Sequence, residues 1–375
     1  MPRPVDYRRR GQAVWLDSIS DRMIQDGRLA AWIAAGTIYG VTSNPSIFGQ
    51  AIERNEGDYN DRLASLARQG KDAFAIYDEL TRRDIAAGAD LFRAQHEANP
   101  ADGWISLEVL PSLARDTEGT VAEAKRLHGL LGRPNVLIKV PATAEGIPAV
   151  RRLIAAGISV NVTLMFNRRH YQDVAWAYVE GLEERLATRG DLAGLTDLSS
   201  VQSVASFFVS RVDTLVDGLL EKKGRKDGTL ALAGKAGLAN CRVVYQDFLA
   251  IFGSDRFKAL AARGARVQRP LWASTGTKNP AYSDLLYVED LVGPDTVNTM
   301  PEKTLAALLD HGRDLGDAVL EGADEAQDHL DALRSHGIDV EALGETLQDD
   351  GVALFAKSYD QLLSTIDSRR EAVAG

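Results

Sequence analysis

The stretch NVLIKVPATAEGIPAV, residues 135–150, places one lysine inside an apolar run. Its aliphatic residues favour extended backbone, and the run is closed by Pro141 before a helix begins near Thr143. A short, continuous apolar run of this kind predicts a strand buried on both faces, as the strands of a parallel sheet are. Lys139 therefore stands at the C-terminal end of a core strand.

Lys139 needs a chemical explanation, because lysine is rarely buried without a partner. Desolvating an ammonium group is costly, which favours the neutral amine in an apolar pocket. A neutral amine is a nucleophile suited to attack a carbonyl carbon. The alternative is an edge-strand lysine whose head group reaches solvent along its own stem. The rest of the chain has to distinguish these two interpretations.

Composition and charge describe an ordinary globular chain with an acidic balance. The 375 residues, 45% hydrophobic and 26% charged, allow one large α/β domain or two smaller ones. The net charge of -10 argues against nucleic acid or anionic membrane as a partner. A phosphate-bearing substrate must then be held by a local basic group.

Targeting and redox signals point to the cytoplasm. The N-terminal MPRPVDYRRRG is charged but has no apolar segment behind it, so it does not resemble a secretory signal. No apolar run approaches the roughly 20 residues that a membrane span requires. The single cysteine, Cys241, excludes an internal disulfide and is expected to be a small buried apolar residue. We expect a cytoplasmic protein without a membrane partner.

Strands and helices alternate along the chain, which predicts parallel strands joined by helical crossovers. Eight such units within about 300 residues fit a (β/α)8 barrel. The doubly wound alternative needs a glycine-rich first turn, and neither GxGxxG nor GxxxxGK[ST] occurs in the sequence. The predicted strands lie at 14–19, 41–48 with an end near Asn44, 104–111, 136–140, 159–166, 203–208, 269–275 and 296–301. The predicted helices include 21–35, 59–97, 117–131, 147–156 and 239–252.

The chain changes character from residue 303 onward, where it becomes helical and acidic. Aspartate and glutamate recur there on what we interpret as solvated helix faces, in an appendage that covers one side of the barrel. We therefore expect a single domain over residues 1–375, with the barrel at about 12–302 and the helical appendage at about 303–375.

Polar residues end the eight apolar runs, at the edge where a parallel barrel carries its catalytic groups. Each one alone has an ordinary explanation, since carboxylates cap helices and hydroxyls satisfy backbone amides. Two carboxylates, a lysine, an amide and several hydroxyls on one face are harder to explain as capping. These residues are Asp17, Asn44, Glu108, Lys139, Thr163, Ser206, Ser274 and Thr299.

The set is coherent for Schiff-base chemistry. A lysine imine turns a ketone into an electron sink, so that a neighbouring carbon–carbon bond breaks and leaves an enamine. The departing hydroxyl must lose a proton, and imine formation and release need a further acid and base, so two carboxylates fit two tasks. The histidines all fall outside the strand ends, which argues against a histidine base or a histidine metal site. They are His96, His128, His170, His311, His329 and His336.

Several segments together resemble the transaldolase family, in the longer form found in actinobacteria and their relatives. They are VWLDSI, GVTSNPSIF, SLEVLP, NVLIKVPAT, NVTLMF, SFFVSR, WASTGTKNP and NTMP, and the resemblance spans nearly the whole chain. The specific pair is NVLIKVPAT followed by NVTLMF, while the other fragments are weak alone.

The resemblance implies roles for four catalytic residues. The family's Schiff-base lysine matches Lys139, and its catalytic aspartate matches Asp17, which removes the proton from the C4 hydroxyl. The glutamate and threonine that hold and activate a water match Glu108 and Thr163.

The resemblance also implies a set of substrate-binding residues. Asparagines that bind substrate hydroxyls match Asn44 and Asn161, and the phosphate-binding serine and arginine match Ser206 and Arg211, with Phe208 beside them. A bidentate arginine clamp suits a phosphate.

The sequence departs from the family pattern at residues 273–280, which read ASTGTKNP. Shorter transaldolases carry a second phosphate-binding arginine there, in an ASFRN stretch. This chain has no arginine at that place, and Lys278 or the hydroxyls of Ser274 and Thr275 are the candidate substitutes.

On this resemblance the chain is a transferase of the non-oxidative pentose phosphate pathway. It would move a dihydroxyacetone unit from sedoheptulose 7-phosphate to glyceraldehyde 3-phosphate, giving erythrose 4-phosphate and fructose 6-phosphate. No metal or organic cofactor is implied, because the imine serves as the electron sink. The expected partners are small sugar phosphates, and the expected assembly is a monomer or homodimer.

Three alternatives stay open. A fructose 6-phosphate aldolase would use the same lysine but release the three-carbon unit to water. Chain length and Glu108 argue against it, since such aldolases tend to differ from transaldolases at this position. A non-catalytic sugar-phosphate-binding barrel would be favoured if Lys139, Asp17 or Glu108 were replaced, and none of them is. An unrelated phosphate-binding isomerase barrel would not need Lys139 at mid-barrel.

Overall fold

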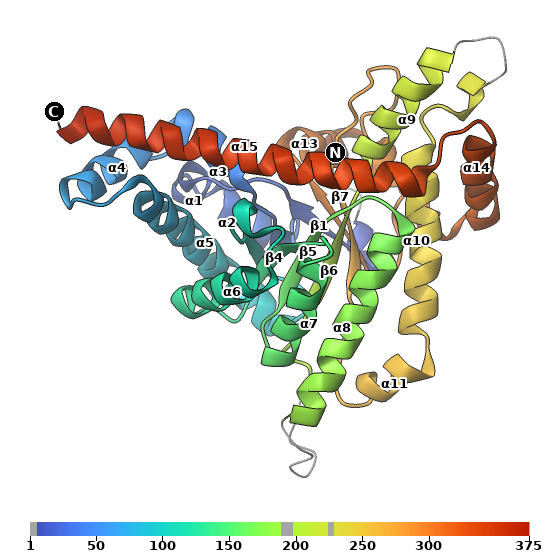
Figure 1. The fold of residues 1–375 in the computed structure, drawn as a ribbon, viewed down its shortest axis with the longest axis horizontal. Helices are drawn as coiled ribbons and strands as arrows, with labels where there is room; N and C mark the ends of the chain where they lie inside the picture. Colours follow the sequence, from blue (N-terminus) through green and yellow to red (C-terminus); the bar gives the residue numbers. More distant parts are fainter. Residues whose placement is uncertain (1–5, 189–197, 224–228, 375) are drawn as a thin grey trace.

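The computed structural model describes residues 6–188, 198–223 and 229–374. In these parts of the chain, eight parallel strands close into a barrel in chain order, with β8 pairing back onto β1 (Figure 1). The predicted (β/α)8 fold is confirmed. The strands are β1 Gln12–Leu16, β2 Gly40–Val41, β3 Trp104–Glu108, β4 Val136–Pro141, β5 Val160–Met165, β6 Ser203–Phe208, β7 Arg269–Ala273 and β8 Thr296–Met300.

Helices surround the barrel and follow its strands (Figure 1). None of the described helices has the length and apolar character needed to cross a membrane. The helices are α1 Asp21–Gln25, α2 Arg28–Ala34, α3 Pro45–Glu53, α4 Tyr59–Arg68, α5 Ala73–Ala98, α6 Thr117–Leu131, α7 Gly146–Ala156, α8 Arg168–Thr188, α9 Ser210–Lys223, α10 Ala236–Phe252, α11 Asp255–Ala261, α12 Leu286–Glu289, α13 Glu302–His311, α14 Ala323–Ser335 and α15 Val340–Ala374. Short 3₁₀ turns occupy Tyr7–Arg10, Pro111–Leu113, Thr229–Leu232 and Ala318–Leu320.

The β4 strand is buried along its whole length, as its apolar run predicts. Its register sets the site, because Lys139 is paired with Glu108 of β3 on one side and with Asn161 of β5 on the other. Pro141 is paired with Thr163, two residues beyond Asn161 along β5. Polar residues from three consecutive strands are thereby brought to the C-terminal end of the barrel.

Three predicted elements are wrong in extent. The strand predicted at 41–48 is only β2, Gly40–Val41, because Asn44 caps α3 through its side chain and Pro45 occupies the first turn. The helix predicted at 21–35 is divided at Gly27, which adopts a left-handed φ of 78° between α1 and α2.

The helix predicted at 59–97 is also divided, at Gly70, into α4 and α5. The other predicted strands and helices are confirmed to within a few residues, and the 117–131 helix coincides with α6. A charged loop expected around residues 221–228 lies partly outside the described residues, since 224–228 are not among them.

The acidic C-terminal segment has a buried face that its composition did not indicate. Helix α15 crosses the C-terminal end of the barrel, and its contacts reach α3, α4, α5, α9 and β5 (Figure 1). Its buried residues recur every three or four positions, as one face of a helix does. They are Val340, Gly344, Leu347, Gln348, Gly351, Phe355, Tyr359, Leu362 and Ile366.

Gly40 lies at a closely packed point of the barrel. A Cβ atom at this position would lie 2.5 Å from Cε2 of Trp15 and 2.7 Å from the carbonyl oxygen of Trp104. Both neighbours belong to strands next to β2, so neither can move freely. We predict that Gly40→Ala lowers the free energy of unfolding by about 1–3 kcal/mol, the usual cost of overpacking a core.

Gly129 provides the matched control for this prediction. It lies in α6, is exposed, and an added Cβ there would meet nothing within 4 Å. Gly129→Ala is expected to stabilise the protein by up to about 1 kcal/mol through helix propensity. Denaturant unfolding of both variants measures the difference, and equal effects would contradict the packing argument.

Candidate active site

A cavity of about 130 Å³ lies at the C-terminal end of the barrel. It is lined by residues from five of the strands' ends, the loops that follow, and α15. The lining residues are Asp17, Thr42, Asn44, Lys139, Thr163, Ser206, Phe208, Arg211, Ala273, Ser274, Gly276, Lys278, Thr299, Pro301 and Phe355. Most of the residues predicted from sequence are therefore brought together around one cavity.

Lys139 projects into this cavity and is only 4% exposed. Its Nζ donates a hydrogen bond to the carbonyl oxygen of Ser43 at 3.1 Å and lies 3.4 Å from Oε2 of Glu108. The edge-strand interpretation, in which the head group reaches solvent, is therefore wrong. A buried amine with one carboxylate beside it can act as a nucleophile or hold a proton, according to the charge of that carboxylate.

Glu108 and Thr163 flank Lys139 on the neighbouring strands. Burial raises the pKa of Glu108 above its ordinary value, while Lys139 lowers it and Asp17 adds a smaller rise. Oε2 of Glu108 and Oγ1 of Thr163 are buried without a hydrogen-bond partner in the described part of the chain. Both atoms are available to bind a water or a substrate hydroxyl, which suits an acid–base pair.

Asp17 follows β1 directly and is held by a chain of hydroxyl groups. Thr42 Oγ1 donates to Oδ1 of Asp17 at 2.6 Å, and the hydroxyl of Thr299 lies 2.7 Å from that of Thr42. Because the proton of Thr42 goes to the carboxylate, Thr299 is the donor of the second bond. The two hydroxyl groups fix Oδ1 of Asp17, while Oδ2 accepts no hydrogen bond from the described residues and can face a substrate.

The predicted asparagines and serine differ in their access to the cavity. Asn44 lines it, although its Oδ1 also accepts the backbone N–H of Ile47 as the cap of α3. Asn161 is fully buried, donates to Ser106 Oγ at 3.0 Å and accepts from Ser206 Oγ at 2.7 Å. It is not among the residues on the cavity wall, whereas Ser206 is.

Arg211 and Lys278 form a cationic end of the cavity. The guanidinium of Arg211 lies 5.1 Å from the ring centroid of Phe208 and makes no ion pair or hydrogen bond within residues 6–188, 198–223 and 229–374. Burial lowers its pKa, an effect that Asp17 partly opposes, but an arginine stays charged at neutral pH. An unpaired, partly buried guanidinium is suited to bind a phosphate.

Lys278 is the best placed of the candidate substitutes for the second arginine. It lines the reaction cavity and also a neighbouring cavity of about 460 Å³ that shares Arg211 with it. Thr275 Oγ1 is buried and donates to the carbonyl oxygen of Thr299, and Ser274 Oγ lies 2.9 Å from Ser210 Oγ. The hydroxyls therefore already have partners, whereas the lysine is exposed.

Two site residues escaped the sequence-based prediction. Thr42 stands two positions before Asn44, but nothing in GVTSNPSIF distinguishes its hydroxyl from that of Ser43. Phe355 belongs to α15, far from the barrel strands in the chain, and its spacing indicates only a buried helix face.

Within the described residues, no group of three or more histidine, cysteine, aspartate or glutamate side chains is placed to hold a metal ion.

The fold and this site together define a (β/α)8 barrel of the class I aldolase type. The sequence profile of the Transaldolase/Fructose-6-phosphate aldolase family matches residues 14–366. A transaldolase of Saccharopolyspora erythraea is 49% identical over 95% of this chain and 94% of its own length. A transaldolase of Mycolicibacterium smegmatis is 48% identical over 96% of both chains, and one of Trichodesmium erythraeum is 41% identical over 96% and 95%. The chain belongs to the transaldolase/fructose-6-phosphate aldolase family, as its motifs predict.

The cationic end generates a prediction for Lys278. Lys278→Ala is expected to raise KM for phosphorylated substrates by about tenfold, the loss of one charge-assisted contact, and to leave kcat nearly unchanged. Steady-state kinetics with fructose 6-phosphate and erythrose 4-phosphate measure both values.

Lys222 offers the matched control, because it lines the neighbouring cavity but not the reaction cavity. Lys222→Ala should keep KM close to the wild-type value. An unchanged KM in Lys278→Ala would remove this residue from the phosphate site.

Proposed function

We propose that the protein is a transaldolase of the non-oxidative pentose phosphate pathway. It moves the dihydroxyacetone unit of sedoheptulose 7-phosphate to glyceraldehyde 3-phosphate, giving erythrose 4-phosphate and fructose 6-phosphate. The observation that carries this proposal is the buried Lys139 amine at the cavity, with two carboxylates nearby and a free guanidinium at one end. Relatives over nearly the full length are named transaldolase.

In the proposed mechanism, Lys139 Nζ attacks the ketone carbon of the donor sugar and a water leaves as the imine forms. Glu108 and Thr163 are the proposed acid–base pair for this water, since Oε2 of Glu108 lies beside the amine and neither this oxygen nor Oγ1 of Thr163 has a hydrogen-bond partner among the described residues. The raised pKa of Glu108 favours a carboxyl group that can give as well as take a proton.

Asp17 is the proposed base for carbon–carbon cleavage. It removes the proton from the C4 hydroxyl, the bond to C3 breaks, and the electrons pass into the protonated imine to form an enamine. Thr42 and Thr299 hold the carboxylate in position for this step. The enamine then adds to the aldehyde carbon of the acceptor by the reverse sequence.

Substrate binding is proposed to divide between the two ends of the cavity. Asn44 and Ser206 bind hydroxyls near the reacting carbons, and Arg211 with Lys278 binds the phosphate at the cationic end. Asn161 acts through its hydrogen bond to Ser206 and thus orients that hydroxyl.

We also propose a single domain, a cytoplasmic location, and a monomer or homodimer as the assembly.

Borohydride trapping tests the central step. Incubation with fructose 6-phosphate followed by reduction should leave a three-carbon adduct on Lys139, which peptide mapping locates. Lys139→Ala should give no adduct and lose transfer activity. Folded wild-type protein without any adduct would contradict the proposed function, and an adduct on another lysine would contradict the assignment of Lys139.

The two carboxylates can be told apart by the mass that is trapped. Asp17→Asn should form the imine but fail to cleave it, so reduction leaves the whole six-carbon phosphate on Lys139 and turnover falls at least about a hundredfold. Glu108→Gln should slow formation of the adduct itself. A three-carbon adduct formed by Asp17→Asn at the wild-type rate would exclude Asp17 as the cleavage base.

A further inference from the structure

Helix α15 lies over the open end of the barrel and is attached to it beside the reaction cavity. Gln348 is buried, and its Nε2 donates to the carbonyl oxygens of Ala142 at 2.9 Å and Leu164 at 3.0 Å. Ala142 directly follows β4, and Leu164 belongs to β5. Leu164 has a left-handed φ of 62° at a register shift of β5. The helix comes so close there that a Cβ on Gly351 would lie 2.9 Å from Cδ2 of Leu164.

Further contacts hold both ends of α15. Near its start, Asn167 Nδ2 donates to the carbonyl oxygen of Glu341 at 2.9 Å. Near its end, the Arg369 guanidinium donates to the carbonyl oxygens of Ile52 and Glu53 of α3, each at 2.8 Å. These bonds join α15 to opposite sides of the barrel, as Figure 1 shows for the path of the helix.

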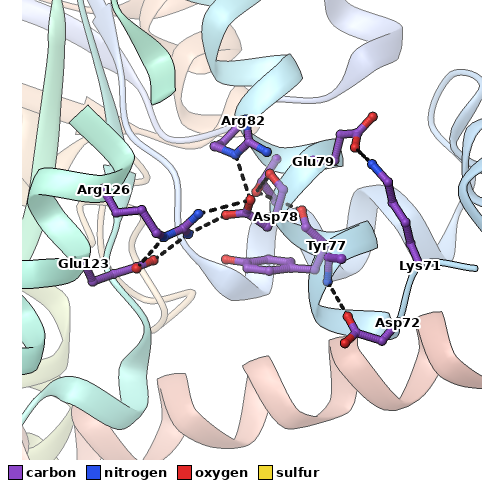
Figure 2. Close-up of polar contacts among 10 residues, drawn as sticks. Lys71, Asp72, Tyr77, Asp78, Glu79, Arg82, Glu123 and Arg126 are labelled. Carbon is purple, nitrogen blue, oxygen red and sulfur yellow. Dashed lines mark hydrogen bonds and ion pairs between the residues drawn. The ribbon is translucent and has the colours of Figure 1, made fainter. Parts of the chain in front are cut away.

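The middle of α15 rests on α5, which is itself joined to α6. The ring of Tyr359 on α15 meets that of Tyr77 edge-on at 5.1 Å between centroids. Beside Tyr77, Asp78 accepts from Arg126 of α6 at 2.6 Å, and Arg126 also pairs with Glu123 (Figure 2). Beneath its middle, α15 therefore rests on helix α5, which the ion pair of Asp78 with Arg126 joins to α6.

Phe355 is the residue that α15 places over the nucleophile. It is 5% exposed, and Nζ of Lys139 lies 5.7 Å from its ring centroid. It lines the reaction cavity on one side and, on the other, a small cavity of about 10 Å³ next to Glu108. The phenyl ring thus separates the amine from the solvent beyond α15.

The small cavity beside Glu108 is at the lower limit of the room that one water molecule needs, and apart from Glu108 the side chains that line it are apolar. A single water is what imine formation releases and what hydrolysis of the product imine consumes in each turnover. Glu108 is the residue of this lining whose side chain can bind such a water.

The intermediate that needs this protection is the enamine left after cleavage. If it takes up a proton at C3, it becomes an iminium ion, and one water can add at C2. The resulting carbinolamine then breaks its carbon–nitrogen bond, which frees dihydroxyacetone and restores the amine of Lys139. This reaction consumes one water and involves no change of oxidation state overall, and it competes with addition to the acceptor aldehyde.

We propose that Phe355 is a specificity-determining residue that commits the three-carbon intermediate on Lys139 to transfer instead of hydrolysis, by covering the amine with an apolar ring. This inference rests on the proposed role of Lys139. It assigns to the C-terminal helix a part in the reaction that the barrel motifs do not carry.

The test measures how the three-carbon enamine on Lys139 divides between hydrolysis and transfer to the acceptor. Phe355→Ala is incubated with fructose 6-phosphate, with and without erythrose 4-phosphate, and free dihydroxyacetone and sedoheptulose 7-phosphate are quantified. The ratio of release to transfer is expected to rise about tenfold over wild type. Phe355→Leu, which keeps an apolar side chain, should raise the ratio much less.

Leu354→Ala is the matched control, because Leu354 is the neighbouring residue of α15, is 46% exposed and does not line the reaction cavity. Its ratio should equal that of wild type. If release and transfer fall together in Phe355→Ala with an unchanged ratio, the ring has only a structural role and the inference is overturned.

Borohydride trapping separates this failure from failure of the proposed function. A three-carbon adduct on Lys139 in wild type and in Phe355→Ala, with no change in ratio, would overturn only the role of Phe355. Absence of the adduct in wild type would overturn the proposed chemistry itself. Should Phe355→Ala not fold, the ratio in Phe355→Leu decides, and a wild-type value there counts against the inference.

Discussion

The burial of one amine is the constraint on which the rest of this structure depends. An ammonium group in a barrel interior loses its hydration, and a single carboxylate at 3.4 Å offsets that loss only in part. Burial raises the pKa of the Glu108 carboxyl above its ordinary value, and the nearby Lys139 amine opposes that rise. Parallel pairing of β3, β4 and β5 creates this setting, because it places Glu108 level with Lys139 and brings Thr163 two residues further along β5, opposite Pro141.

The polar side chains around the amine differ in how firmly hydrogen bonds within the protein hold them. Asp17, Asn161 and Thr275 each have hydrogen bonds within the protein that fix their orientation. Arg211 and Lys278, in contrast, form no hydrogen bond or ion pair within the described part of the chain. This contrast fits the roles proposed above, since groups that act on reacting carbons need fixed positions, while groups that bind a mobile phosphate need available charge.

Much of this arrangement could be predicted from the sequence, for a physical reason. Buried parallel strands are apolar throughout, so a polar residue such as Lys139 at their end is easily noticed, and barrel closure brings such ends together. The same reasoning failed for β2, because its two residues carry too little pattern and the capping side chain of Asn44 resembles a strand end. Phe355 could not be predicted, since the pattern of α15 indicates a buried face but not which element it covers.

The order of the chain has a consequence for biosynthesis. All eight strands precede α15, so a nascent chain can close its barrel before the helix that covers Lys139 has been made. At about 5–20 residues per second, synthesis of the segment after β8 takes on the order of seconds. During that interval α15 does not yet cover Lys139, and the cover forms only when this helix docks. On the proposed roles of Lys139 and Phe355, docking of α15 is the step that makes the barrel selective.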